Sequence, residues 1–260
     1  MSLKILNIQK SFGKTEAVKN ISFEAKGGKI TGLIGPNGSG KTTTLNIITS
    51  VVIPDKGDVS LFGVKQAENI EQLKAKIGYV PDEIAIAYKL TGREFIKFTL
   101  RLFDAFDENH RKFAFELCEL FQLSNRLDDF VEEYSHGMLK KLLLISAVAH
   151  TPPLLVLDEP SNGLDPEMAI LLKSLIKEYA MLGNIVLLST HHLEFSEQLC
   201  DEVILIQKGQ IIAAGSPQEL KIKTNQPSFE KAAFNIFNFN DKLEHLKKIF
   251  SRLPASNRVA

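Results

Sequence analysis

Short apolar runs bounded by turn residues recur along the chain and predict strands. Residues 154–157 and 185–188 are continuously apolar, which is typical of strands buried on both faces of a parallel sheet. Further strands are predicted at residues 3–8, 21–25, 30–34, 77–80, 203–206 and 211–212, with a hairpin-like element at 57–66. The pattern favours a mostly parallel sheet with an antiparallel β element.

Apolar residues change to helical spacing between residues 84 and 150. Thr91 and Glu94 match a capping box, which places the start of a helix there. The apolar face of that helix is predicted at Phe95, Phe98, Leu102 and Phe103. We expect residues 84–150 to form a helical subdomain inserted into one large domain over residues 1–220.

Residues 221–260 differ in character from the rest and predict a C-terminal helical extension. One face of the helix expected at residues 241–250 carries Leu243, Leu246, Ile249 and Phe250. The favoured interpretation is a helix that folds back on its own domain. Contact with a second copy or with a membrane partner is the alternative.

Composition narrows the class of partner. The 260 residues include 31 basic and 31 acidic side chains, so the formal net charge is zero and the broad attraction that most nucleic-acid binders show is missing. We therefore expect no nucleic-acid partner.

No apolar run approaches the length of a membrane span, and the first ten residues lack the apolar block of a signal peptide, which predicts a cytoplasmic location. Cys118 and Cys200 lie in apolar patterns and are expected to be buried.

A phosphate-loop (Walker A) pattern, G-x-x-x-x-G-K-[ST], follows the strand predicted at residues 30–34. Its glycines allow backbone N–H groups to approach phosphate oxygens, and the helix predicted at 42–48 presents its N-terminus to the anion. Lys41 is expected to reach the β and γ phosphates, and the Thr42 hydroxyl to bind Mg²⁺. The predicted nucleotide-binding residues are Gly35, Pro36, Asn37, Gly38, Ser39, Gly40, Lys41, Thr42 and Thr43.

Two later strands are predicted to end in polar residues. Asp158 and Glu159 follow the apolar run 154–157, and His191 and His192 follow the run 185–188. Carboxyl ends of parallel strands meet at one edge of a sheet, where ligands bind in α/β folds. Asp158 and Glu159 are therefore expected at the C-terminal edge of the sheet.

Together with the segment Tyr134-Ser135-His136-Gly137-Met138, these motifs resemble, in order and spacing, the nucleotide-binding subunit of ABC transporters over roughly residues 3–220. The resemblance implies an α/β fold, a phosphate-loop NTPase core with an inserted helical subdomain. It also implies ATP and Mg²⁺ as cofactors.

The resemblance assigns roles to further residues. Phe12 matches the aromatic that stacks on adenine, and Asp158 the acid of the Mg²⁺ shell. Glu159 matches the general base that orients the attacking water, and His191 the histidine that contacts the γ phosphate. Residues 161–165 match the loop at the dimer seam. His192 has no counterpart and is expected at the surface.

Two departures from the family pattern stand out. The usual Leu-Ser-Gly-Gly-Gln is replaced by residues 134–138, in which only Ser135 and Gly137 survive, and these two are predicted to bind nucleotide. His136 is expected to face solvent, with added positive charge near phosphate as the alternative. Asp82 stands where a glutamine is usual, and it is predicted to accept from water or bind Mg²⁺. Both departures resemble the subfamily that drives drug, antibiotic or polysaccharide exporters.

The predicted function is that of an ATPase subunit whose two copies, as a homodimer or heterodimer, enclose two ATP molecules between Lys41 of one chain and Ser135 of the other. Hydrolysis would drive a separate integral membrane permease from the inner face of the membrane. One alternative is a soluble ABC-type ATPase acting as a switch on ribosomes or DNA. Another is an inactive regulatory cassette, against which Glu159 and His191 argue.

Overall fold

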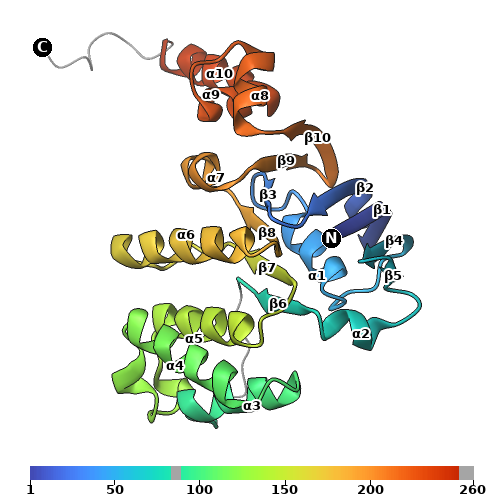
Figure 1. Ribbon diagram of the computed structural model, residues 1–260. Helices are drawn as coiled ribbons and strands as arrows, with labels where there is room; N and C mark the ends of the chain where they lie inside the picture. The colour runs from blue at the N-terminus through green and yellow to red at the C-terminus, as the bar shows by residue number, and fades with distance from the viewer. Residues whose placement is uncertain (83–88, 252–260) are drawn as a thin grey trace, which may run out of the picture.

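The computed structural model describes residues 1–82 and 89–251 (Figure 1). Its strands are β1 (Ser2–Phe12), β2 (Thr15–Lys26), β3 (Ile30–Ile34), β4 (Lys56–Leu61), β5 (Val64–Lys65), β6 (Ile77–Val80), β7 (Leu154–Asp158), β8 (Ile185–Thr190), β9 (Glu202–Gln207) and β10 (Gln210–Gly215). Its helices are α1 (Lys41–Ile48), α2 (Ile70–Lys74), α3 (Gly92–Leu102), α4 (Glu108–Leu120), η1 (Ser124–Arg126), η2 (Val131–Glu133), α5 (His136–Ala149), α6 (Pro166–Met181), α7 (Leu193–Leu199), α8 (Pro217–Thr224), α9 (Phe229–Ile236) and α10 (Phe239–Ser251).

Two sheets organise the molecule. The larger has the order β10-β9-β3-β8-β7-β6, in which only the edge strand β10 is antiparallel to its neighbour. The smaller sheet, β2-β1-β4-β5, is antiparallel throughout. The predicted α/β class, a mostly parallel sheet with an antiparallel β element, is confirmed.

The central strands are buried on both faces, as their apolar runs predicted. In β7, Leu154 and Val156 pack toward α1 and the antiparallel sheet, whereas Leu155 and Leu157 pack toward α5 and α6. This two-residue period follows from the strand geometry. The core thus forms two layers, one on each side of the large sheet.

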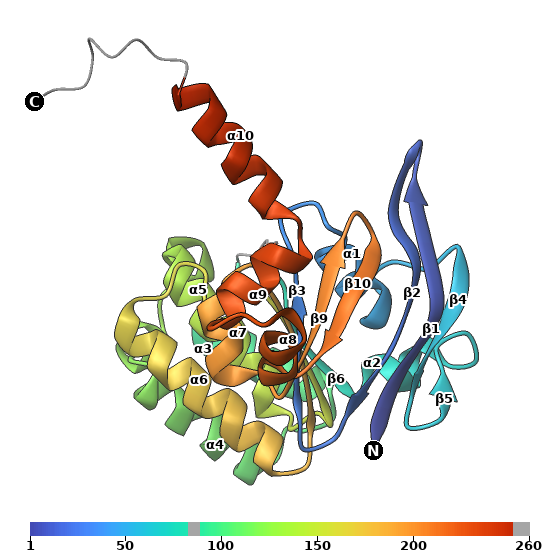
Figure 2. The same cartoon turned by 90° about the horizontal axis from the view of Figure 1, so that it is seen from above.

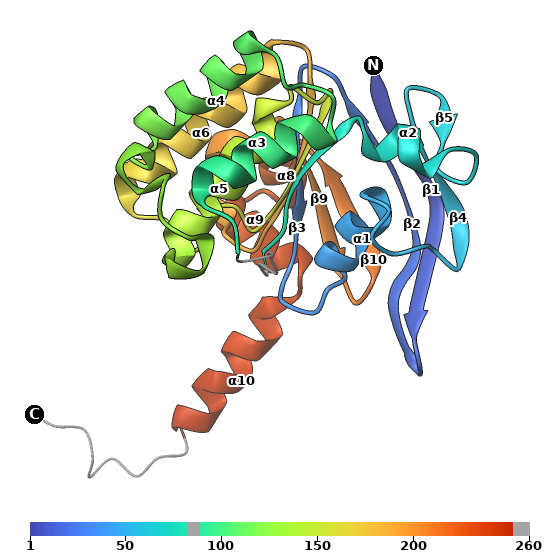
Figure 3. The same ribbon diagram turned by 90° about the horizontal axis from the view of Figure 1, so that it is seen from below.

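The helical insert lies below β6 and β7 in Figure 1 and is seen from below in Figure 3. The capping box predicted at Thr91 and Glu94 is present at the start of α3. The predicted apolar face is partly wrong, since Ile96 and Leu100 are buried whereas Phe98 and Leu102 are exposed, at 53% and 65%. Buried residues four positions apart define the packed face. The predicted first residue of the insert, at position 84, lies outside the described residues.

The C-terminal helices behave in two ways. Helices α8 and α9 pack on the body of the protein, where Phe229 and Phe237 are buried. Helix α10 instead projects away from it (Figure 2), and Leu246, Ile249 and Phe250 are all exposed. The expectation that this helix folds back on its own domain is therefore wrong; the side chain of Leu243 lies outside the described residues. Asn238, with φ 57°, redirects the chain between α9 and α10.

Within residues 1–82 and 89–251, no helix has the length and apolarity that crossing a bilayer demands.

Candidate functional site

The phosphate loop connects β3 to α1 and depends on glycine at two close approaches. Gly40 has φ 105°, and a Cβ there would lie 2.5 Å from the carbonyl oxygen of Ala17. A Cβ on Gly35 would lie 2.2 Å from the carbonyl oxygen of Ile206. The loop is therefore held against β2 and β9 by contacts that exclude any larger residue. This packing directs the loop and the first N–H groups of α1 toward one cavity.

The cavity in front of the phosphate loop has a volume of about 700 Å³. Its lining joins the loop to the ends of other elements: Thr15, Glu16, Ala17, Lys19, Asn37, Gly38, Gly40, Lys41, Thr42, Thr43, Asp82, Glu159 and Lys208. Among the described residues, the buried hydroxyl of Ser39 has no hydrogen-bond partner. A polar, roomy cavity beside backbone N–H groups at a helix N-terminus fits a phosphate-bearing ligand.

Lys41 is the first residue of α1, and its side chain turns back over the loop. The ammonium Nζ donates to the carbonyl oxygen of Gly35 at 2.8 Å and lies 3.5 Å from Glu159 Oε1. The side chain is 6% exposed. Nζ also donates to the carbonyl oxygen of Pro36 at 3.4 Å. A buried cation with two carbonyls and one carboxylate as partners is placed to bind an anion that enters the cavity.

Asp158 is the last residue of β7 and is fully buried. One carboxylate oxygen accepts a hydrogen bond from Ser189 Oγ of β8, and the other has no partner among the described residues. Burial raises the pKa of Asp158, and the neighbouring hydroxyls of Ser189 and Thr42 oppose that rise. A buried carboxylate oxygen without a partner, beside the Thr42 hydroxyl, is a donor set that fits Mg²⁺.

Glu159 follows β7 in a left-handed conformation, with φ 46°. The turn separates its side chain from that of Asp158 and directs it toward the end of β8. There Oε1 lies 2.9 Å from His191 Nδ1, and Oε2 accepts from the His191 N–H at 3.3 Å. The carboxylate thus stands between Lys41 and His191. The structure thus brings together the ends of β7 and β8, which carry Glu159 and His191.

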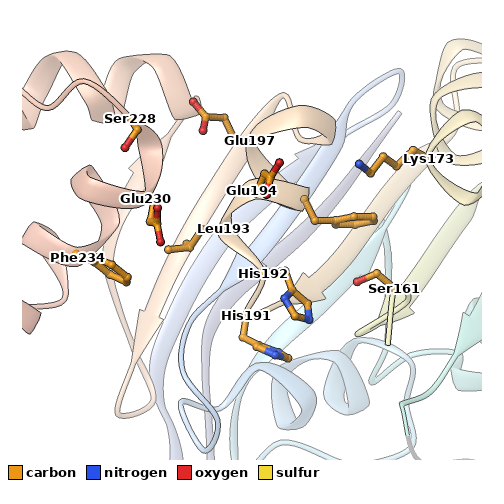
Figure 4. Close-up of a pocket in the computed structure, with 11 residues that line it drawn as sticks. Ser161, Lys173, His191, His192, Leu193, Glu194, Glu197, Ser228, Glu230 and Phe234 are labelled. Carbon is orange, nitrogen blue, oxygen red and sulfur yellow. The ribbon is translucent and has the colours of Figure 1, made fainter. Parts of the chain in front are cut away.

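A second cavity, of about 730 Å³, is lined by residues from the end of β8 and from α6, α7 and α9 (Figure 4). His191 and His192 both line it, and their ring centres are 4.0 Å apart. His192 is exposed, as predicted, and its Nε2 lies 3.3 Å from Asn162 Oδ1. Partial burial and the neighbouring His191 lower the pKa of His192, so the neutral ring is favoured.

Asp82 lines the phosphate-loop cavity, but its hydrogen bonds go to residues that do not line it. Its Oδ1 accepts from Lys140 Nζ at 3.1 Å and from Asn162 Nδ2 at 3.4 Å. Sequence reasoning missed Lys140 and Asn162. The only local signal for Lys140 was a lysine inside the apolar helix that follows Ser135.

The lining of this cavity does not include the predicted site residues Gly35, Pro36, Ser39, Asp158, His191, Phe12, Ser135 and Gly137. Three of these, Phe12, Ser135 and Gly137, belong neither to the phosphate loop nor to the ends of β7 and β8. Ser135 caps α5 by accepting from the Met138 N–H at 3.3 Å, and both it and His136 are exposed at the start of that helix. Gly137 is in the same turn. Phe12 ends β1, is 52% exposed, and has Lys10 Nζ 5.7 Å from its ring centre. None of the three lines the cavity within the described part of a single chain.

Comparison with known proteins agrees with this geometry. A protein-family model described as "ABC transporter" matches residues 18–162. The chain is 36% identical over 218 residues to the linearmycin resistance ATP-binding protein LnrL of Bacillus subtilis, covering 84% of this chain and 70% of that one. It is 36% identical over 214 residues to the Nod factor export ATP-binding protein I of Burkholderia orbicola, covering 82% and 70%. A solved ATP-binding subunit of an ABC transporter superposes with a TM-score of 0.87 at 26% identity, covering 91% of this chain and all of that one.

Proposed function

Because this chain belongs to the ABC transporter family and is one of its ATP-binding, ATP-hydrolysing subunits, we propose that Lys41 binds the triphosphate while Glu159 and His191 carry out its hydrolysis. The observation that carries the proposal is the position of the Glu159 carboxylate, 3.5 Å from Lys41 Nζ and 2.9 Å from His191 Nδ1 at the cavity wall. A carboxylate at that point orients and deprotonates a water molecule beside the γ phosphate.

Mg²⁺ belongs to the same proposal. Thr42 and Asp158 would hold the ion, through the hydroxyl at the start of α1 and the unpartnered buried carboxylate oxygen. When bound, the ion would neutralise charge that develops on the phosphates. Asp82 faces the same cavity, but its bonded oxygen is already engaged by Lys140, so a role in water or metal binding falls to Oδ2.

Ser135 and Gly137 enter the proposal through a second copy of the subunit. They are at the N-terminus of α5, on the helical insert, and outside the cavity of their own chain. A helix N-terminus with exposed Ser135 and with Gly137 in its first turn suits contact with the phosphate of a partner chain. Two subunits, identical or different, would enclose two nucleotides in this way, with Phe12 of each chain stacked on adenine.

ATP-binding subunits of this family work with a membrane permease. We place this subunit at the inner face of the membrane, where its dimer would open and close with the permease. The relatives named for linearmycin resistance and for Nod factor export support an export role. The replacements at Asp82 and at residues 134–138 point the same way.

Hydrolysis and dimerisation are tested together. Purified wild-type protein is expected to release phosphate from ATP, and Glu159→Gln is expected to bind ATP without hydrolysing it. With ATP and Mg²⁺, size-exclusion chromatography of Glu159→Gln should give a dimer. A Glu159→Gln protein that binds ATP yet stays monomeric at all nucleotide concentrations would contradict the composite site, and wild-type activity in that variant would contradict the assignment of the base.

A further inference from the structure

A buried lysine joins the helical insert to the catalytic strand end. Lys140 is in the second turn of α5 and is 3% exposed. Its ammonium Nζ donates to the backbone carbonyl oxygen of Glu159 at 2.8 Å and to Asp82 Oδ1 at 3.1 Å. Lysine is seldom buried unless its charge is paired and its donors are used. Both conditions are met here by groups from two other segments.

The contact brings three parts of the chain to one point. Lys140 belongs to α5, whose first turn carries Ser135; Asp82 lies two residues beyond β6; and Glu159 follows β7. Asn162 adds a third hydrogen bond by donating from Nδ2 to the same oxygen of Asp82 at 3.4 Å. In this ion pair the side chain of Lys140 is buried, whereas that of Asp82 is 38% exposed and lines the phosphate-loop cavity.

Glu159 is held through its backbone on both sides. Its N–H donates to the carbonyl oxygen of Ser189 at 3.1 Å. Its own carbonyl oxygen accepts from Lys140 Nζ at 2.8 Å and from the Asn162 N–H at 3.2 Å. The residue needs such support because its φ of 46° is unfavourable for a residue with a side chain. Lys140 is the side chain from α5 that contributes to this support of the Glu159 backbone.

We propose that Lys140 is a positioning residue that couples the orientation of α5 to the Glu159 carboxylate, with Asp82 as its counter-charge. The inference rests on the proposed role of Glu159 in ATP hydrolysis. When α5 moves relative to β7, Lys140 either holds or releases the Glu159 carbonyl, and the carboxylate turns toward or away from the γ phosphate. Ser135 at the start of α5 and Lys140 in its second turn move together, because both belong to one rigid helix. A movement that positions Ser135 therefore also positions the Glu159 carboxylate.

The test compares two lysines of the same helix. Lys140→Met keeps most of the buried stem and removes the ammonium, whereas Lys141→Met removes the same charge from the neighbouring, less buried position. Rates are measured per folded molecule, at a temperature where circular dichroism shows both variants folded. We expect Lys140→Met to lower kcat for ATP at least tenfold while the Kd for ATP stays within twofold of wild type. Lys141→Met is expected to keep wild-type values of both.

A double-mutant cycle with Asp82→Asn tests the pairing and does not depend on Lys140→Met alone. If Lys140 and Asp82 act as one unit, the double variant loses no more kcat than the more damaged single variant. Losses that multiply, or a folded Lys140→Met protein with kcat within twofold of wild type, would overturn the inference. Absence of hydrolysis in the wild-type protein would instead overturn the proposed function, so the two failures are distinguishable.

Discussion

The Lys41 ammonium lies 3.5 Å from Glu159 Oε1, and both side chains are 6% exposed. The cation that the phosphate loop offers to a triphosphate is thus partly neutralised by the carboxylate proposed as the base. A phosphate bound by Lys41 must compete with that carboxylate, and once bound it lies beside it. Binding and hydrolysis are therefore linked through this one ion pair.

Neutralising Glu159 should strengthen ATP binding. In Glu159→Gln the competing charge is removed and repulsion of phosphate is relieved, which we expect to lower the Kd for ATP about fivefold, corresponding to about 1 kcal/mol. Isothermal titration calorimetry measures the change. Glu24→Gln, an exposed position on β2, serves as the matched control. A weaker affinity in Glu159→Gln would show that the ion pair does not oppose phosphate binding.

Removing Lys41 should have the opposite effect. Lys41→Ala deletes the buried cation of the cavity wall. Charge-assisted hydrogen bonds to phosphate are worth about 1.5–3 kcal/mol, or about 10- to 150-fold in Kd. Fluorescence titration with a labelled ATP analogue follows the loss. Lys29→Ala, which breaks an exposed pair with Glu202, is the control and should bind normally. If Lys41→Ala and Lys29→Ala bound ATP with equal affinity, the phosphate loop would not be the ATP-binding site.

Tyr134 should stabilise the helical insert without contributing to ATP affinity. Its Oη donates to the Arg126 carbonyl oxygen at 2.6 Å, and burial raises its pKa to about 12. A Cβ on Gly92 would lie 2.1 Å from the hydroxyl oxygen of Tyr134. Gly92→Ala is expected to cost about 1–3 kcal/mol of the free energy of unfolding, and Tyr134→Phe about 1 kcal/mol. Denaturant unfolding measures both, and the double variant should lose less than the sum because the clashing oxygen is absent; full additivity would argue against the contact.

Protonation of His150 should make the protein less stable in acid. The ring is 8% exposed and stacks on Phe103 with centres 3.9 Å apart, and burial lowers its pKa. The unfolded chain therefore binds a proton first, so stability is complete above the ordinary histidine pKa of about 6.5 and declines as pH falls below it, by at most about 1.4 kcal/mol per pH unit. His150→Leu removes this site. Urea unfolding between pH 7.5 and pH 5.5 should show a smaller loss in the variant, and an equal loss would exclude His150 as a source.

The exposed face of α10 should be dispensable for the stability of the subunit. Leu246→Ser combined with Phe250→Ser changes only exposed side chains, so the free energy of unfolding should stay within about 0.5 kcal/mol of wild type. Phe229→Ala, in the buried part of the same extension, should cost about 3–5 kcal/mol. Thermal or urea unfolding of the three proteins makes the comparison. A large loss in the α10 variant would mean that this helix packs on the body in solution.

Features encoded in a few neighbouring residues could be read without coordinates. The phosphate loop, the capping box at Thr91 and Glu94, and the buried strand ahead of Asp158 each depend on local chemistry: backbone freedom, a side chain that reaches the next turn, or a continuous apolar run. The order of these elements was enough to predict the α/β core and the two strands that end in polar residues. Family resemblance then supplied the roles.

Contacts between distant segments needed the fold. The pairing of Lys140 with Asp82 spans 58 residues of the chain. The left-handed turn that directs Glu159 to His191 could not be predicted from the neighbouring residues. The packed face of α3 differed from the predicted one because its neighbours, and not its own periodicity, decide which side is buried. Helix α10 likewise projects from the body although its own periodicity predicted an apolar face that packs. Local sequence selects each element, whereas long-range packing and charge pairing decide which way its side chains point.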